Sequence, residues 1–168
     1  MKRLLIAMMI MVAGFQANAG IYVEPYLAYN LVGDYDGADT NGLNLGGRLG
    51  YSLPMLVSFG LDYNFGEYTH DIAGTDVDVD HSKLGAFVAV DLPILARAYA
   101  SYYFNAKAEA NGVESEGSGF GLGVGLTMLP FVSINFEYRS LNYDESNGAT
   151  VDEDADEILV GVSVPLDL

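Results

Sequence analysis

The stretch LNLGGRLGYSLPMLVSFGLDYNF, residues 43–65, contains two runs of alternating residues that are joined at one proline. In each run an apolar residue is followed by a small, polar or charged one. Successive side chains of a strand point to opposite faces, so this period of two predicts a β-strand on each side of the proline. Pro54 cannot donate to a sheet ladder and favours a turn. The stretch therefore predicts a tight antiparallel hairpin.

The same junction recurs along the chain. An apolar residue, a proline and another apolar residue occur at Leu53-Pro54-Met55, Leu92-Pro93-Ile94, Leu129-Pro130-Phe131 and Val164-Pro165-Leu166, with the prolines 39, 37 and 35 residues apart. Three copies join alternating segments, whereas the fourth lies within the last segment. Helical spacing is weak, and the alternation predicts strands at about 20–31, 42–53, 55–67, 80–92, 94–108, 117–129, 131–143 and 156–168.

The connections alternate between short and long. Between the proline turns lie polar stretches rich in Asp, Glu, Gly, Asn and Thr, which are expected to be long loops at 32–41, 68–79, 109–116 and 144–155. Long loops at one end and short turns at the other are typical of outer-membrane barrels. The expected fold is all-β: a transmembrane, antiparallel, up-and-down eight-stranded β-barrel, with both mature ends at the short-turn end.

The first residues have the pattern of a cleaved signal peptide. Lys2 and Arg3 precede an apolar run that is too short for a membrane helix, and Ala17-Asn18-Ala19 supplies a small-residue cleavage site. The expected division is a signal peptide at 1–19 and one barrel domain at 20–168. The mature chain then carries five basic and 23 acidic residues, a net charge of −18, which argues against a nucleic-acid partner. The chain has no cysteine, which excludes disulfides, thiolate metal sites and a cysteine nucleophile.

The alternation gives each strand one apolar face and one small, polar or charged face. If the apolar face lined the interior, the chain would be a soluble, lipocalin-like carrier of apolar ligands. Opposite charges on the polar face favour a membrane barrel instead, because a poorly hydrated interior requires paired ions. The expected lumen ion network comprises Glu24, Arg48, Asp62, Arg97, Glu137 and Arg139. The expected aromatic belt at the membrane interface comprises Tyr29, Tyr63, Phe65, Tyr102, Phe104, Phe120 and Tyr138.

With its signal peptide, eight alternating segments and unequal connections, the chain resembles the small eight-stranded bacterial outer-membrane barrels of the OmpX and OmpA transmembrane-domain type. The resemblance covers the whole mature chain and implies a location in the outer membrane of a Gram-negative cell. Members usually end in an aromatic residue that the barrel assembly machinery is thought to read. This chain ends in Leu168 instead.

Large and small residues on the polar face are complementary. Gly119, Gly121, Gly123 and Gly125 of one segment are expected to make room for arginine and tyrosine side chains of neighbouring strands. An eight-stranded barrel is just wide enough for side chains to fill it. The preferred interpretation is a packed salt-bridge core, and a narrow gated pore is the alternative.

Of the 23 carboxylates, 14 lie within the polar connections and four more lie at their edges. A solvated, self-repelling surface is the simplest interpretation. Carboxylate oxygens also suit Ca²⁺ or Mg²⁺, and such ions could bridge the chain weakly to lipopolysaccharide. The weak metal candidates are Asp76, Asp78, Asp80, Asp152, Asp154 and Asp156. An EF-hand is excluded, because His81 and Phe87 occupy the positions of its obligatory glycine and glutamate.

The residues give no sign of an enzyme. His70 and His81 are the two histidines, and Ser82 would point to the opposite face from His81. The sequence therefore predicts a non-enzymatic protein without a catalytic site or a cofactor, and a monomer. It would support the outer membrane or meet an unknown surface partner through its acidic loops. Outer-membrane lipids, lipopolysaccharide and the assembly machinery are the other expected partners.

Overall fold

A computed structural model describes residues 20–54, 56–72, 75–129 and 131–168, with the side chains of Ile72, Asp76, Met128 and Leu129 excepted. The predicted signal peptide, Met55 and Pro130 lie outside the described residues. The strands are β1 (Gly20–Tyr35), β2 (Ala38–Leu53), β3 (Val57–Ile72), β4 (Thr75–Leu92), β5 (Ala96–Ala110), β6 (Val113–Leu129), β7 (Val132–Ser146), β8 (Ala149–Ser163) and β9 (Leu166–Asp167).

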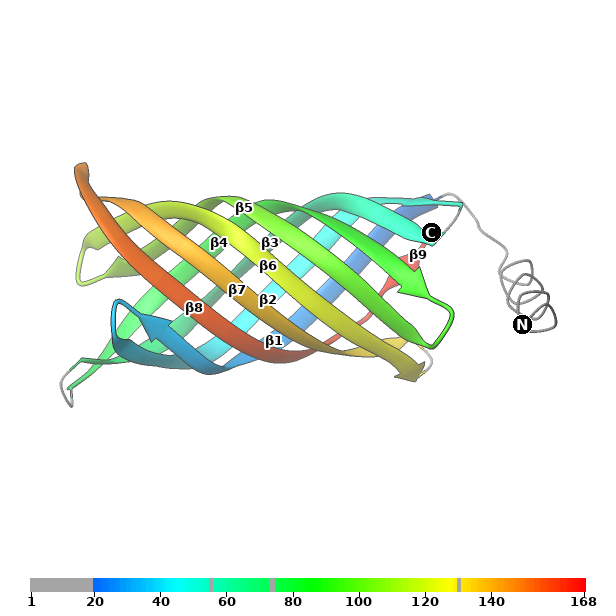
Figure 1. Ribbon diagram of the computed structural model, residues 1–168, viewed down its shortest axis with the longest axis horizontal. Coiled ribbons are helices and arrows are strands. Elements are labelled where there is room, and N and C mark those ends of the chain that lie inside the picture. Colours follow the sequence, from blue (N-terminus) through cyan, green and yellow to red (C-terminus); the bar gives the residue numbers. More distant parts are fainter. Residues whose placement is uncertain (1–19, 55, 73–74, 130) are drawn as a thin grey trace, which may run out of the picture.

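The strands form one closed antiparallel barrel (Figure 1). Each strand from β1 to β7 pairs with the next along the chain, and β1 closes the cylinder by pairing with β2 on one side and with β8 and β9 on the other. Gly20 and the C-terminal Leu168 lie at one end, which we call the terminal end. The opposite end, which holds the turns after β1, β5 and β7, is the tip end. The predicted all-β, eight-stranded, up-and-down architecture is confirmed.

The apolar face of the barrel points outward. In β3, Phe59, Leu61 and Tyr63 are each about half exposed, whereas Asp62 and Asn64 between and beside them are fully buried. The other strands follow the same alternation, which is the reverse of a soluble barrel with an apolar pocket. Among the described residues no helix has the length and apolarity needed to cross a membrane.

The prediction of four long polar loops is wrong. The strands continue through most of these stretches, and Asp36-Gly37, Asn111-Gly112 and Asn147-Gly148 form two-residue turns in which both residues have positive φ. Such turns require φ > 0 at both positions, which Asn-Gly and Asp-Gly favour. The apolar alternation ends where the outer face becomes polar, but backbone pairing continues, for example between Glu109 and Glu114. The tip end is therefore a set of paired hairpins.

The last predicted strand is interrupted. β8 ends at Ser163 and β9 begins at Leu166, so Pro165 lies between them rather than within a continuous strand. A proline has no N–H to donate to the ladder. The Val164 amide still donates to the Pro25 carbonyl of β1 at 3.0 Å. At the other proline junctions Leu56, Leu95 and Phe131 adopt positive φ, which closes each turn.

Candidate functional site

The barrel interior holds a buried ionic network around Arg48. The register places Arg48 of β2 directly between Glu24 of β1 and Asp62 of β3. Its guanidinium nitrogens lie 3.1 Å from Glu24 Oε2, 3.0 Å from Asp62 Oδ2 and 3.3 Å from Glu137 Oε2. Arg139 pairs with Glu137 through Nε and Oε1 at 2.6 Å. These five side chains are almost fully buried and link opposite walls of the barrel.

Tyrosines complete the hydrogen bonding of this network. The Tyr26 hydroxyl donates to Asp62 at 2.7 Å, and the hydroxyls of Tyr99 and Tyr103 each donate to Glu137 at 3.1 Å. The Arg48 guanidinium carbon lies 4.0 Å from the centre of the Tyr99 ring. Buried ions are tolerated only when charges and hydrogen bonds are both satisfied. The network nearly meets that condition, because each charge is paired and Arg139 Nη2 is its one buried nitrogen without a hydrogen-bond partner among the described residues.

Arg97, the sixth residue of the expected ion network, lies nearer the terminal end. Its Nε contacts Asp91 Oδ1 at 2.6 Å and its Nη2 contacts Asp91 Oδ2 at 3.0 Å, whereas Glu24 is 3.7 Å away. Asp91 was not among the predicted site residues. The sequence does indicate this pair, because Asp91 and Arg97 flank the Pro93 turn and are direct partners across it.

A second buried pair, which was not among the expected site residues, lies nearer the tip end. Lys83 Nζ lies 2.9 Å from Glu157 Oε1, and Arg139 Nη1 lies 3.6 Å from Glu157 Oε2. Lys83 falls on the polar face of β4, so the alternation of residues along this strand was enough to place its side chain in the interior. Glu157 directly follows a run of carboxylates at 152–154 and 156, so its sequence context is that of the acidic surface. Its side chain nevertheless points inward, next to buried Leu159.

Apolar and aromatic side chains fill the interior at the tip end. Tyr103, Leu141 and Tyr143 form a buried cluster with smaller residues of β4, β5 and β8, and Tyr35 packs against it. His70 and His81 lie next to Tyr35 and Tyr68, with the ring centres of Tyr68 and His81 4.5 Å apart. The interior is thus charged in the middle and largely aromatic toward the tip end.

The glycines of β6 make room for large side chains. A Cβ on Gly123 would overlap the Tyr99 ring, and one on Gly121 would lie 2.9 Å from Glu137 Oε1. A Cβ on Gly125 would lie 2.6 Å from Asn135 Oδ1. Gly119 differs, because its Cβ would meet the backbone of Ser140 on β7.

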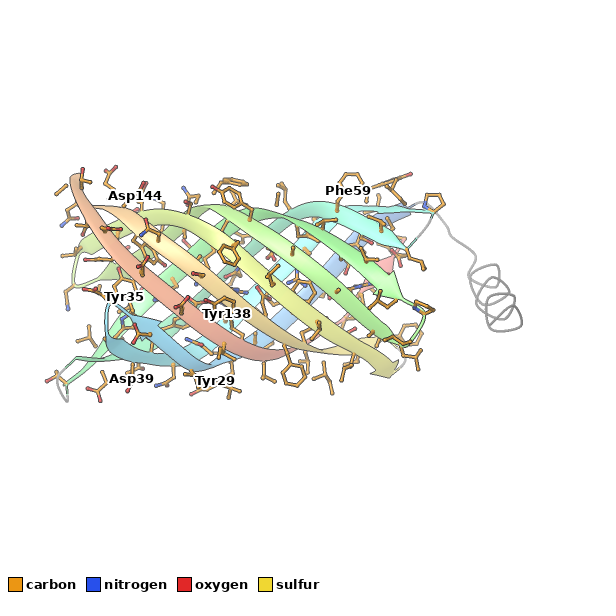
Figure 2. The ribbon with its side chains drawn as sticks, in the orientation of Figure 1. Tyr29, Tyr35, Asp39, Phe59, Tyr138 and Asp144 are labelled. Carbon is orange, nitrogen blue, oxygen red and sulfur yellow. The ribbon has the colours of Figure 1, made fainter. Side chains whose placement is uncertain are left out.

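The residues of the predicted aromatic belt all point outward and are about half exposed: Tyr29, Tyr63, Phe65, Tyr102, Phe104, Phe120 and Tyr138. Some of their hydroxyls reach polar groups nearer the tip end, since Tyr138 donates to Asp156 at 2.7 Å and Tyr29 donates to Asn41 at 3.2 Å. Figure 2 shows Tyr29 and Tyr138 along the barrel, with Asp39 and Asp144 toward the tip end and Phe59 toward the terminal end.

Beyond the belt, four carboxylates form a row across neighbouring strands. Glu67, Asp80, Glu109 and Glu114 are direct partners on β3, β4, β5 and β6. Like charges directly opposite each other destabilise a sheet. Lys107 lies beside this row and pairs with Glu114 and Glu116, and that contact lowers the pKa of Glu114.

The net charge of residues 20–168 is therefore concentrated on the surface of the barrel. Four of the five basic residues, Arg48, Lys83, Arg97 and Arg139, are buried and paired with carboxylates in the interior. Lys107 is the exposed exception. The interior is close to neutral, and the large excess of carboxylates lies on the hairpins of the tip end.

The metal candidates do not converge in the described residues. Asp78 and Asp80 alternate along the outer face of β4, and the Asn142 amide donates to Asp152 at 2.9 Å and to Asp154 at 3.0 Å. Asp156 instead accepts the bond from Tyr138. Asp76 lies in β4, with its side chain outside the described part. No group of three or more histidine or carboxylate ligands suitable for a metal occurs among the described side chains.

No family model matches the chain, and no curated protein matches it. Several solved structures do match it. Neisserial surface protein A has 20% identity, a TM-score of 0.59 and coverage of 88% of this chain and 98% of its own. The N-terminal β-barrel domain of Pseudomonas aeruginosa OprF has 20% identity, a TM-score of 0.58 and coverage of 89% and 100%. Ail, the attachment invasion locus protein of Yersinia pestis, has 13% identity, a TM-score of 0.58 and coverage of 89% and 99%. This chain therefore has the fold of the small eight-stranded outer-membrane β-barrels.

Proposed function

We propose that this chain is a non-enzymatic barrel of a bacterial outer membrane, exported through its signal peptide and monomeric in the bilayer. Its role would be to support the membrane and to present acidic hairpins to a surface partner. The half-exposed apolar face supports the membrane location, because so large an apolar surface requires burial. The outward aromatic side chains suit the interface between lipid tails and headgroups.

The filled interior favours this role over that of a channel. Arg48 connects carboxylates of β1, β3 and β7, the ring of Tyr99 packs beside Arg48, and the ring of Tyr103 packs beside Arg139. An ion would have to displace these buried pairs in order to pass. This cross-barrel network is the observation that carries the proposal of a closed barrel.

Conductance in planar lipid bilayers tests this proposal directly. Purified wild-type protein is expected to give no discrete, reproducible current steps. A variant with alanine at both Tyr99 and Tyr103 serves as the positive control, because it removes two rings from the interior. Reproducible steps from the wild-type protein would establish the pore alternative instead.

A fractionation experiment tests the location separately. The protein is expected in the outer-membrane fraction of a Gram-negative host, where the assembly machinery would insert it. Its folded form should migrate differently on a gel before and after boiling. Recovery of the mature chain as a soluble monomer without detergent would overturn the membrane proposal.

Lipids of the outer membrane are the proposed immediate partners. The carboxylate row of Glu67, Asp80, Glu109 and Glu114 lies just beyond the aromatic belt, where lipopolysaccharide phosphates would be found. Two anionic surfaces repel each other, so weakly bound Mg²⁺ or Ca²⁺ would bridge them. Equilibrium dialysis of the protein against ⁴⁵Ca²⁺, with and without lipopolysaccharide, measures this binding. Equal uptake in both samples would argue against bridging.

A further inference from the structure

We propose that His70 and His81 form an acid-sensitive latch that holds the tip-end extension of the β3–β4 hairpin against the barrel interior. The extension comprises the described residues 67–72 and 75–80 and lies beyond Phe65, the last outward aromatic residue of β3. This inference goes beyond the proposed function and does not depend on it.

The two imidazoles meet end to end. His70 Nε2 and His81 Nε2 are 3.3 Å apart, and the ring planes differ by 20°. The ring centres are 5.5 Å apart, which exceeds the nitrogen separation by about two ring radii and shows that the rings point at each other. Both side chains are only 4% exposed.

This contact accommodates only one proton between the rings. A hydrogen bond between two imidazole nitrogens needs one that carries a proton and one that offers a lone pair. When both rings are imidazolium ions, both Nε2 atoms carry protons and the contact becomes repulsive. The paired state therefore excludes the doubly protonated form, and acidification must separate the rings.

The surrounding groups give little compensation for two new positive charges. Tyr35 of β1 packs on His70 with ring centres 5.1 Å apart, and Tyr68 of β3 packs on His81. The charged groups nearby are Lys83 of β4 and Glu157 of β8. Glu157 is already paired with Lys83 at 2.9 Å and approached by Arg139 of β7. The neighbouring positions Thr40 of β2 and Ala108 of β5 are neutral.

The chemistry of this environment favours neutral histidines. Burial lowers the pKa of His70, with Glu157 raising it and Lys83 lowering it. Burial also lowers the pKa of His81 well below 6.5, and Lys83 and His70 lower it further. Both rings are therefore uncharged at neutral pH and take up protons only when the surroundings become acidic.

The contact between the two histidines joins the two strands of one hairpin. His70 and His81 lie on β3 and β4, and Tyr68 and Val79 are buried between them on the inner face. The outer face of the same extension carries Glu67, Asp78 and Asp80, which are exposed. The inward side chains hold the extension in place, so separation of the two imidazoles frees the extension and opens this side of the tip end.

Hydrogen–deuterium exchange of the folded protein in detergent micelles tests the latch. Protection factors, corrected for intrinsic exchange, are compared at about pH 8 and about pH 5, the range in which histidine changes charge. Protection of amides 67–80 is expected to fall about tenfold or more. Each histidine that gains a proton only in the open state raises the population of that state by up to tenfold per pH unit. The β7–β8 extension, residues 144–155, is the internal control, since it carries carboxylates and no histidine.

The matched variant is His70→Gln/His81→Gln, which retains polar side chains that cannot titrate in this range. Its folding is checked by migration on a gel before boiling. It is expected to lose the pH dependence at residues 67–80 and to retain the behaviour of residues 144–155. An equal loss of protection in variant and wild type, or no loss in the wild type, would overturn the latch. Should the double variant fail to fold, His70→Gln alone serves the same comparison.

Discussion

Tyr99 of β5 occupies the space that Gly123 leaves open directly opposite it on β6. The ring reaches across this gap to Arg48, and its hydroxyl reaches Glu137. A residue without a side chain therefore positions an aromatic ring at the centre of the ionic network. The relationship makes the interior sensitive to a single methyl group.

Gly123→Ala is expected to destabilise the barrel by about 1–3 kcal/mol, because the new Cβ would force the Tyr99 ring away from its partners. Gly47→Ala is the matched control, since its Cβ would meet only the Glu24 carbonyl oxygen at an ordinary 3.8 Å. Urea unfolding in micelles, followed by tyrosine fluorescence, measures both. Equal midpoints for the two variants would mean that the Tyr99 packing contributes little.

Arg48→Ala is expected to cost about 3–5 kcal/mol, because Glu24, Asp62 and Glu137 would lose their shared cation while remaining buried. Lys107→Ala is the control for loss of a positive charge at an exposed position, and a loss of at most about 1 kcal/mol is expected there. The same urea titration compares them. If Arg48→Ala unfolded at the wild-type midpoint, the interior would have to be hydrated enough to solvate the three carboxylates.

The stability of the protein is expected to fall as the pH drops below about 6.5. The pKa values of His70 and His81 are lowered in the folded state, so this state binds fewer protons than the unfolded chain. Such groups contribute their full stability above the unfolded value and lose it as the pH falls toward the folded values. Thermal unfolding midpoints of the wild type and of His70→Gln/His81→Gln are compared from pH 8 to pH 5. The difference between them measures how much the two histidines contribute to the loss of stability. Parallel curves would assign the acid sensitivity to carboxylates.

Asp80→Asn is expected to stabilise the barrel by about 0.2–1 kcal/mol, because it removes one charge from the middle of a like-charged row. Mg²⁺ should raise the unfolding temperature of the wild type more than that of this variant. Asp36→Asn, in a turn away from the row, is the control and should behave like the wild type. A larger response to Mg²⁺ in Asp80→Asn would contradict binding at the row.

The sequence predicted most of what depends on neighbouring residues. Alternation assigned Asp62 to the inside and Leu61 to the outside, and the proline junctions located the turns of the terminal end. The structure brings the six residues expected in the ion network together in the interior, but Arg97 pairs chiefly with Asp91, and Asp91, Lys83 and Glu157 were not among the six. The tip-end hairpins were misread as loops because polarity was given more weight than the Asp-Gly and Asn-Gly turn signals.

The alternation of apolar and polar residues is a local property of the chain. The sequence alone therefore determined the strands, their two faces and the order of the hairpins. Only the tertiary structure decided which inward side chains meet across the barrel. Arg48 reaches Glu137, 89 residues away, and Lys83 reaches Glu157 because closure and strand tilt place them at the same level. The His70–His81 contact also depends on how two rings are packed inside a closed wall. These contacts arise from the stagger of the closed sheet, which no single strand encodes.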